Sequence, residues 1–111
     1  MDKNNLIIQI RQQKKELGGA GTPYILESKG NQILELIGQL MDIVKSEEDY
    51  DMQEFLMYQD AQESLNHTID QEVQRAIKAY SPSSKKKVSK TEYQKELSRA
   101  ISHINRDLNA F

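Results

Sequence analysis

The sequence contains no cysteine, which excludes a disulfide framework and a zinc site held by thiolates. It has no tryptophan, and its two prolines and five glycines interrupt regular secondary structure at few places. No segment approaches the roughly 20 apolar residues that a transmembrane helix needs. The first residues also lack the basic region and apolar run of a signal peptide. We therefore expect a soluble protein in the cytoplasm.

The net charge of -2 hides an uneven distribution of charged residues. Residues 1–80 carry 8 Lys and Arg against 14 Asp and Glu, whereas residues 81–111 carry 7 against 3. The chain thus has an acidic body and a basic C-terminal end. A nucleic-acid-binding domain normally has a larger basic surface, so we expect no nucleic-acid partner.

One stretch, residues 33–44, is apolar around about half of a helical circumference. An ordinary surface helix has a narrower apolar stripe, so this helix needs cover on two sides. The apolar residues that share its main face are Leu26, Ile33, Ile37, Leu40, Met41 and Val44. Because the other helical stretches each have one stripe, the pattern predicts a single all-α domain, an antiparallel up-down-up-down four-helix bundle.

The expected helices cover residues 4–17, 23–45, 52–80 and 89–108. Residues 18–19, both glycine, favour the left-handed conformation in which many helices end. Thr22 supplies an N-cap for the second helix, and Pro23 takes its first position. Gly30 and Gly38 lie inside that helix and indicate that a neighbouring helix approaches closely.

The third helix is the longest, and its apolar stripe continues to residue 80. Asp51 and Glu54 at its start have the spacing of a capping box. Helix propensity is lower at residues 66–68, where Thr68 and Gln71 could open a new helix. The pattern therefore leaves two alternatives, one continuous helix or a break at this point.

The fourth helix has the clearest start signals. Ser89 and Glu92 form a capping box, and Val88 with Tyr93 stands at the positions of a hydrophobic staple. The residues of its single apolar stripe are Tyr93, Leu97, Ala100, Ile101, Ile104 and Leu108. We expect this helix to bury one edge.

No segment has the pattern of a catalytic, cofactor or metal site. The glycines of residues 18–21 fit no phosphate-binding motif, and residues 46–51 lack the ligand spacing of a calcium loop. His67 lies off the apolar stripe without a partner ligand, and His103 with Asp107 could form a surface pair without a nucleophile beside it. We expect neither an enzyme nor a bound cofactor.

Residues 90–102 resemble the start of the last helix in the immunity proteins of class IIa (pediocin-like) bacteriocins, of the enterocin A immunity type. The residues that match this family's Thr-Glu-Tyr-Gln-x-Glu-Leu pattern are Thr91, Glu92, Tyr93, Gln94, Glu96 and Leu97. Over the remaining chain the resemblance is one of size, charged helical composition and four-helix order.

The resemblance implies a cytosolic four-helix bundle that protects a bacteriocin-producing Gram-positive bacterium from its own pore-forming peptide. In that family the bacteriocin captures the membrane part of the mannose permease. The immunity protein then acts from the cytoplasmic side on the receptor with bacteriocin bound, without catalysis, and its C-terminal half decides which bacteriocin is countered.

Two groups of residues are candidates for partner recognition. A basic group, attracted to anionic lipid or to acidic cytoplasmic loops, consists of Lys85, Lys86, Lys87 and Lys90. The C-terminal group, which either docks on the bundle or reads a partner, consists of Asn109, Ala110 and Phe111. This interpretation predicts a monomer with a peripheral contact at the inner face of the membrane.

A small helical adaptor or secretion chaperone is the alternative interpretation from a different class. Such a protein uses apolar helix faces to bind an amphipathic helix of another protein. It predicts an exposed apolar groove and a dimer, whereas the immunity interpretation predicts a closed monomer.

Overall fold

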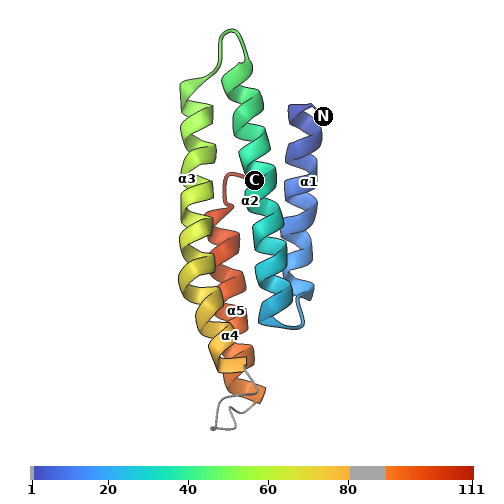
Figure 1. The fold of residues 1–111 in the computed structure, drawn as a ribbon. Helices are drawn as coiled ribbons and strands as arrows, with labels where there is room; N and C mark the ends of the chain where they lie inside the picture. The colour runs from blue at the N-terminus through green and yellow to red at the C-terminus, as the bar shows by residue number, and fades with distance from the viewer. Residues whose placement is uncertain (1, 81–89) are drawn as a thin grey trace.

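The computed structural model describes residues 2–80 and 90–111 and forms an all-α four-helix bundle (Figure 1). No β-strand occurs in this described part of the chain. The elements in chain order are α1 (Lys3–Glu16), the 3-10 turn η1 (Leu17–Gly19), α2 (Pro23–Ser46), α3 (Met52–Thr68), the π-helical turn η2 (Ile69–Val73), α4 (Gln74–Tyr80) and α5 (Lys90–Asp107). The predicted fold class is confirmed.

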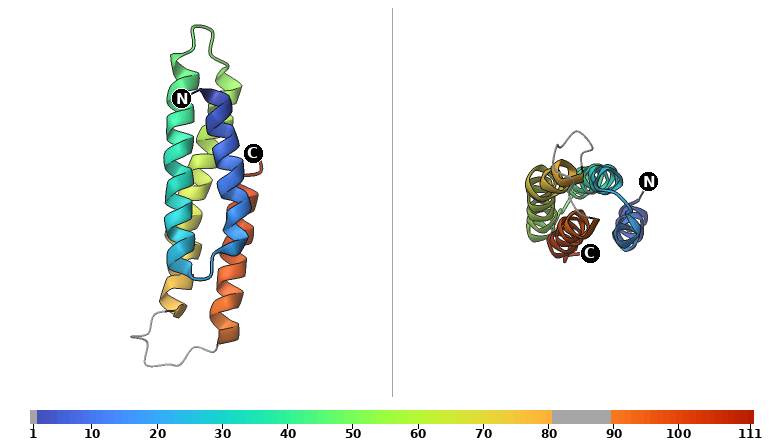
Figure 2. Two further views of the ribbon diagram at one scale, coloured as in Figure 1. Left: turned by 90° about the vertical axis from the view of Figure 1, so that its right-hand side faces the viewer. Right: turned by 90° about the horizontal axis from the view of Figure 1, so that it is seen from below.

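The helices run antiparallel in up-down-up-down order (Figures 1 and 2). The segment formed by α3, η2 and α4 is one continuous rod, with α5 packed along its lower part. Helix α2 lies between this rod and α1, as the end-on view in Figure 2 shows. Because α1 packs mainly on α2, the side of α1 that faces α5 has little cover.

The core consists of the apolar stripes of the helices turned toward α2. The completely buried side chains of α2 are Leu26, Ile33, Ile37, Leu40 and Val44. From the rest of the described chain, the residues buried to the same degree include Leu6, Ile10, Leu65, Val73, Ile104 and Leu108, which directly follows α5. The cover on two sides that the sequence predicts for α2 comes from α1 and from the α3–α4 rod. Burial of these side chains is the main stabilising contribution to the fold.

The two N-cap residues that the sequence predicts within the described residues, Thr22 and Asp51, both cap their helices. The Thr22 hydroxyl accepts a hydrogen bond from the Ile25 amide at 3.2 Å. The Asp51 carboxylate accepts from the Gln53 amide at 2.9 Å and from the Glu54 amide at 3.3 Å. Each cap satisfies amides of the first helical turn that have no partner within the helix.

The predicted left-handed glycine at the end of α1 is wrong. No described residue has a positive φ, and residues 18–19 continue the chain as the 3-10 turn η1. This turn ends with the Ala20 amide donating to the Leu17 carbonyl oxygen at 3.1 Å. Both Leu17 and Ala20 are buried, so packing of the turn against the core replaces the left-handed end.

The rod remains helical through residues 66–73, which settles the two alternatives in favour of continuity. The Thr68 side chain makes no capping bond, and its hydroxyl donates instead to the Asp107 carboxylate of α5. The π-helical turn η2 follows directly, and Ile69 and Val73 within it are buried. A π turn is a local widening of the helix and needs no new helix start.

Gly30 allows the close helix approach that the sequence predicts. A Cβ atom at Gly30 would lie 2.9 Å from Cδ1 of Ile69, closer than side chains normally pack. A Cβ atom at Gly38 would lie 3.5 Å from the amide nitrogen of Gln62, which is ordinary van der Waals contact. The close approach is therefore confirmed at Gly30, where α2 meets η2.

Candidate partner-binding site

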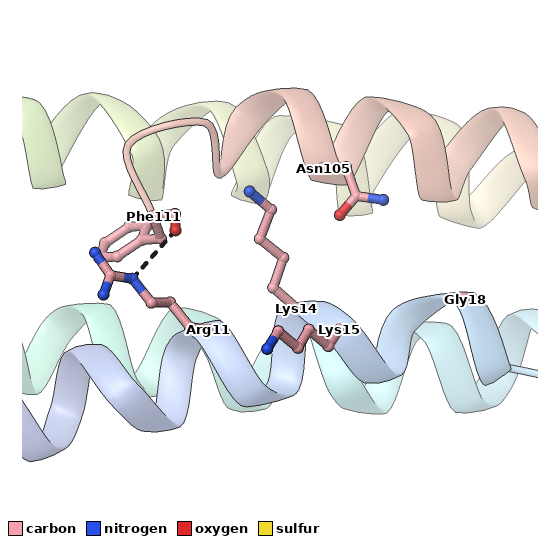
Figure 3. A pocket seen from close by; sticks show the side chains of 6 residues that line it. All are labelled: Arg11, Lys14, Lys15, Gly18, Asn105 and Phe111. Atoms are coloured by element: carbon pink, nitrogen blue, oxygen red, sulfur yellow. Dashed lines mark hydrogen bonds between the residues drawn. The ribbon is translucent and has the colours of Figure 1, made fainter.

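An open groove lies between α1 and the C-terminal end of the chain (Figure 3). We call this hollow of about 470 Å³ the basic groove, and the residues that line it are Arg11, Lys14, Lys15, Gly18, Asn105 and Phe111. A second hollow of about 470 Å³, lined by Ile8, Arg11, Gln12 and Lys15, adjoins it on α1. Arg11 and Lys15 border both hollows, so the two hollows are neighbours along α1, and we call them together the depression.

Two of the cations in the basic groove hold the end of α5. The Lys14 ammonium group donates to the Leu108 carbonyl oxygen at 3.1 Å, and the Arg11 Nε donates to the Phe111 carbonyl oxygen at 3.3 Å. Figure 3 shows both side chains extending from α1 toward this segment. Carbonyl groups at a helix C-terminus lack partners within the helix and favour a positive charge nearby. The contacts therefore connect α1 to a segment about 90 to 100 residues later in the chain.

Phe111 docks on the bundle. Its ring stacks on the ring of Tyr58 with centroids 5.5 Å apart and an angle of 15° between the planes. Tyr58 is only 4% exposed, and its hydroxyl donates to Glu54 at 3.3 Å. Burial raises the pKa of Tyr58, and the negative charge of Glu54 raises it further. Of the two alternatives for the C-terminal group, docking on the bundle or reading a partner, Phe111 thus follows the first. Asn109 and Ala110 are exposed.

A small ion-pair cluster fixes the N-terminal end of α1. The Lys3 ammonium lies 2.9 Å from the Glu54 carboxylate and 3.5 Å from the Glu47 carboxylate. The hydrogen bond to Glu54 is the largest cause of the raised pKa of Lys3. Because this cluster joins α1 to the ends of α2 and α3, α1 is held at both ends while its outer side stays open.

The residues of the family-like pattern lie at the start of α5. Tyr93 packs edge-on against Tyr80 with ring centroids 5.1 Å apart, and Leu97 is 7% exposed. Glu96 lies 3.8 Å from Arg99, and Gln94 is exposed. Thus the described apolar residues of the pattern attach α5 to the end of α4.

Several predicted residues fall where no side-chain contact is described. Lys85, Lys86, Lys87, Val88 and Ser89 lie outside the described residues, and Lys90, Thr91 and Glu92 belong to α5 without described side chains. The predicted capping box and hydrophobic staple of the last helix fall on the same residues and are left without a structural description.

The two histidines lie beside a polar hollow of about 310 Å³ on the opposite side of α5. His103 lies 3.6 Å from Glu72, and Asp107 accepts the hydrogen bond from Thr68, so His103 and Asp107 have different partners rather than each other. His67 is exposed, as its position off the stripe predicts. Among the described side chains, no three potential ligands gather closely enough to hold a metal ion.

The cations of α1 are the site residues that sequence reasoning missed. Arg11, Lys14 and Lys15 lie on a helix with a weak apolar stripe, which Gln13 and Lys14 interrupt, and in the sequence they belong to the acidic part of the chain. The local run Arg-Gln-Gln-Lys-Lys is a signal that could have indicated a basic surface. The position of this run beside Phe111 depends on how α1 packs in the bundle, and neighbouring residues in the sequence do not predict it.

None of the helices in the described residues is both long and apolar enough to cross a membrane. Comparison of the chain with protein-family models, curated proteins and solved structures finds no match.

Proposed function

We propose that this chain is an immunity protein against a class IIa bacteriocin and acts by binding. In this proposal it works at the cytoplasmic face of the membrane, on the mannose permease that has captured the bacteriocin, and prevents a lethal pore. The observation that carries the proposal is the Thr-Glu-Tyr-Gln-Lys-Glu-Leu segment at residues 91–97, which opens the last helix of a four-helix bundle.

The packing of this segment gives the pattern a physical role. Tyr93 and Leu97 attach α5 to the α3–α4 rod, and the direction of α5 then sets where its C-terminal end meets α1. That end carries Phe111 and borders the basic groove. A residue pattern that supports packing at one end of α5 thereby positions a surface suited to recognition at the other end.

The lysine-rich segment supports a membrane-side location. Basic residues near an anionic membrane surface each contribute about 1 kcal/mol of attraction. Lys85, Lys86, Lys87 and Lys90 would thus orient the bundle with this end toward the membrane or toward acidic loops of the permease. Such an electrostatic attachment is weak and sensitive to salt. It suits a protein that has to find its target by moving along the membrane surface.

Affinity isolation from cells tests the proposal. The tagged chain is produced in Gram-positive cells that carry the mannose permease, and the membranes are solubilised with and without a class IIa bacteriocin. We expect the permease to be recovered with the chain only after bacteriocin is added. A pore-forming peptide that does not use the permease serves as the control. Equal recovery of the permease with and without bacteriocin would contradict the proposal.

A helical adaptor or secretion chaperone is the second candidate, and exposed apolar residues on α3 favour it. Met52, Leu56 and Met57 are 52%, 45% and 42% exposed, and such flexible side chains suit the binding of a partner helix. Light scattering of the purified protein separates the candidates, because the adaptor is expected to be a dimer and the immunity protein a monomer.

A further inference from the structure

We propose that the basic groove binds an acidic, amphipathic helical segment of a partner protein. The inference deepens the binding function proposed above and rests on it, because it names the chemistry of the partner that this side of the bundle accepts. It concerns Arg11, Lys14 and Lys15, which are separate from the lysine-rich segment before α5.

The three cations of the basic groove form no ion pair with a described acidic side chain. No Asp or Glu side chain described in the structure lies within ion-pair distance of Arg11, Lys14 or Lys15. By contrast, Lys3 of the same helix pairs with Glu54 at 2.9 Å, and Lys29 of α2 pairs with Glu16 at 3.2 Å. Arg11 and Lys14 donate to main-chain oxygens of the C-terminal segment, and Lys15 is exposed beside them. Among the described residues this surface therefore carries positive charge without acidic side chains beside it, which favours a negatively charged partner.

The spacing of the cations fits carboxylates on a helix. Arg11 and Lys15 are four residues apart on α1, and residues at this spacing lie about 5 to 6 Å apart on a helical surface. Two carboxylates at the same spacing on a partner helix would face them. From Ile8 to Gly18 the depression follows α1 for roughly 15 Å at 1.5 Å per residue, which corresponds to about three turns of a docked helix.

Apolar contacts are available at the edges of the depression. Ile8 is 57% exposed and lines the outer hollow. The partly buried Phe111 lines the inner hollow, while Asn105 of α5 offers an uncharged amide. An amphipathic helix could place apolar side chains against Ile8 and Phe111 and its carboxylates against the cations between them.

The shape of the site favours a protein segment over a lipid surface. The cations line a depression between α1 and the C-terminal segment, and the ring of Phe111 stacks inward on Tyr58. A flat bilayer would meet the outer side of α1, where Ile8 is the large apolar side chain with substantial exposure. An interfacial helix normally inserts a broad apolar face, which this side of α1 lacks.

Fluorescence anisotropy with designed peptides tests the inference on the full chain. The probe is a labelled alanine-based helix that carries leucines on one face and glutamate pairs four residues apart. The matched peptide has glutamine at each glutamate position. We expect the glutamate peptide to bind at least about tenfold more tightly than the glutamine peptide, and we expect its affinity to fall as salt is added.

Charge reversal at Lys15 identifies the site. Lys15 is exposed, so Lys15→Glu leaves the fold intact, and we expect it to weaken binding of the glutamate peptide by about tenfold. Lys45→Glu changes the net charge equally at an exposed position of α2 outside the depression, and it should change the affinity less than about twofold. Thermal melts of both variants verify that they fold.

Four outcomes would overturn the inference: equal binding of the two peptides, equal effects of the two variants, binding to phosphatidylglycerol vesicles in place of the peptide, or self-association through this face. Because the peptides are designed, the experiment is separate from permease recovery. Failure of peptide binding with intact bacteriocin-dependent recovery would remove the groove and leave the proposed function. Peptide binding without such recovery would retain the groove and remove the immunity role.

Discussion

Ile37→Ala is expected to lower the free energy of unfolding by about 3 kcal/mol, because truncation of a buried isoleucine removes apolar burial and leaves a cavity. Ile37 is completely buried on α2, in the core cluster to which α1, α3, η2 and α5 also contribute. For a domain of this size, a loss of about 3 kcal/mol corresponds to a fall in the melting temperature of roughly 15 °C. Chemical and thermal unfolding followed by circular dichroism measures both quantities.

Ile8→Ala is the matched control for this prediction. Ile8 has the same side chain but is 57% exposed on α1, so its truncation should change the stability by less than about 0.5 kcal/mol. Similar losses for the two variants would show that α2 is not the centre of the core.

Gly30→Leu is expected to destabilise the protein by about 2 kcal/mol, because extra side-chain atoms in a packed interior force neighbouring groups to move. The added Cβ alone would lie 2.9 Å from Cδ1 of Ile69, where α2 approaches η2. The higher helix propensity of leucine offsets part of this cost, by up to about 1 kcal/mol. Urea denaturation provides the comparison with the unmodified chain.

Gly38→Leu provides the control on the same helix. At Gly38 the nearest atom is the amide nitrogen of Gln62, at the far end of a flexible side chain and 3.5 Å from the added Cβ, so the first atom of the new side chain meets only ordinary van der Waals contact. We expect this variant to be as stable as the unmodified protein or more stable. Ile69→Ala combined with Gly30→Leu should recover part of the loss, since it removes the atoms that clash. Equal destabilisation by the two glycine substitutions would contradict the close approach.

The parts of the fold that could be predicted from the sequence depend on local patterns. Apolar residues repeat at helical spacing, so the stripe that contains Ile33 and Ile37 indicates both the helix and its buried face. The caps at Thr22 and Asp51 act within one helical turn and can likewise be recognised from neighbouring residues. These local signals explain why the helices and the bundle were predicted.

The remaining features depend on contacts between distant residues. Helix α1 ends in a 3-10 turn because Leu17 packs into the core. This packing outweighs the preference of the two following glycines for the left-handed conformation. The basic groove exists because Lys14 meets the end of α5 and Phe111 reaches Tyr58. The partners in these contacts are separated by about half of the chain or more, so no local pattern predicts them.

The survival of bacteriocin-sensitive Gram-positive cells that produce this chain is the direct test of the proposed immunity function. The cells are challenged with a series of class IIa bacteriocins and, in parallel, with a pore-forming peptide that needs no permease. We expect resistance to one or a few class IIa bacteriocins and unchanged sensitivity to the other peptide. Unchanged sensitivity to every class IIa bacteriocin, or equal protection against both kinds of peptide, would contradict that function.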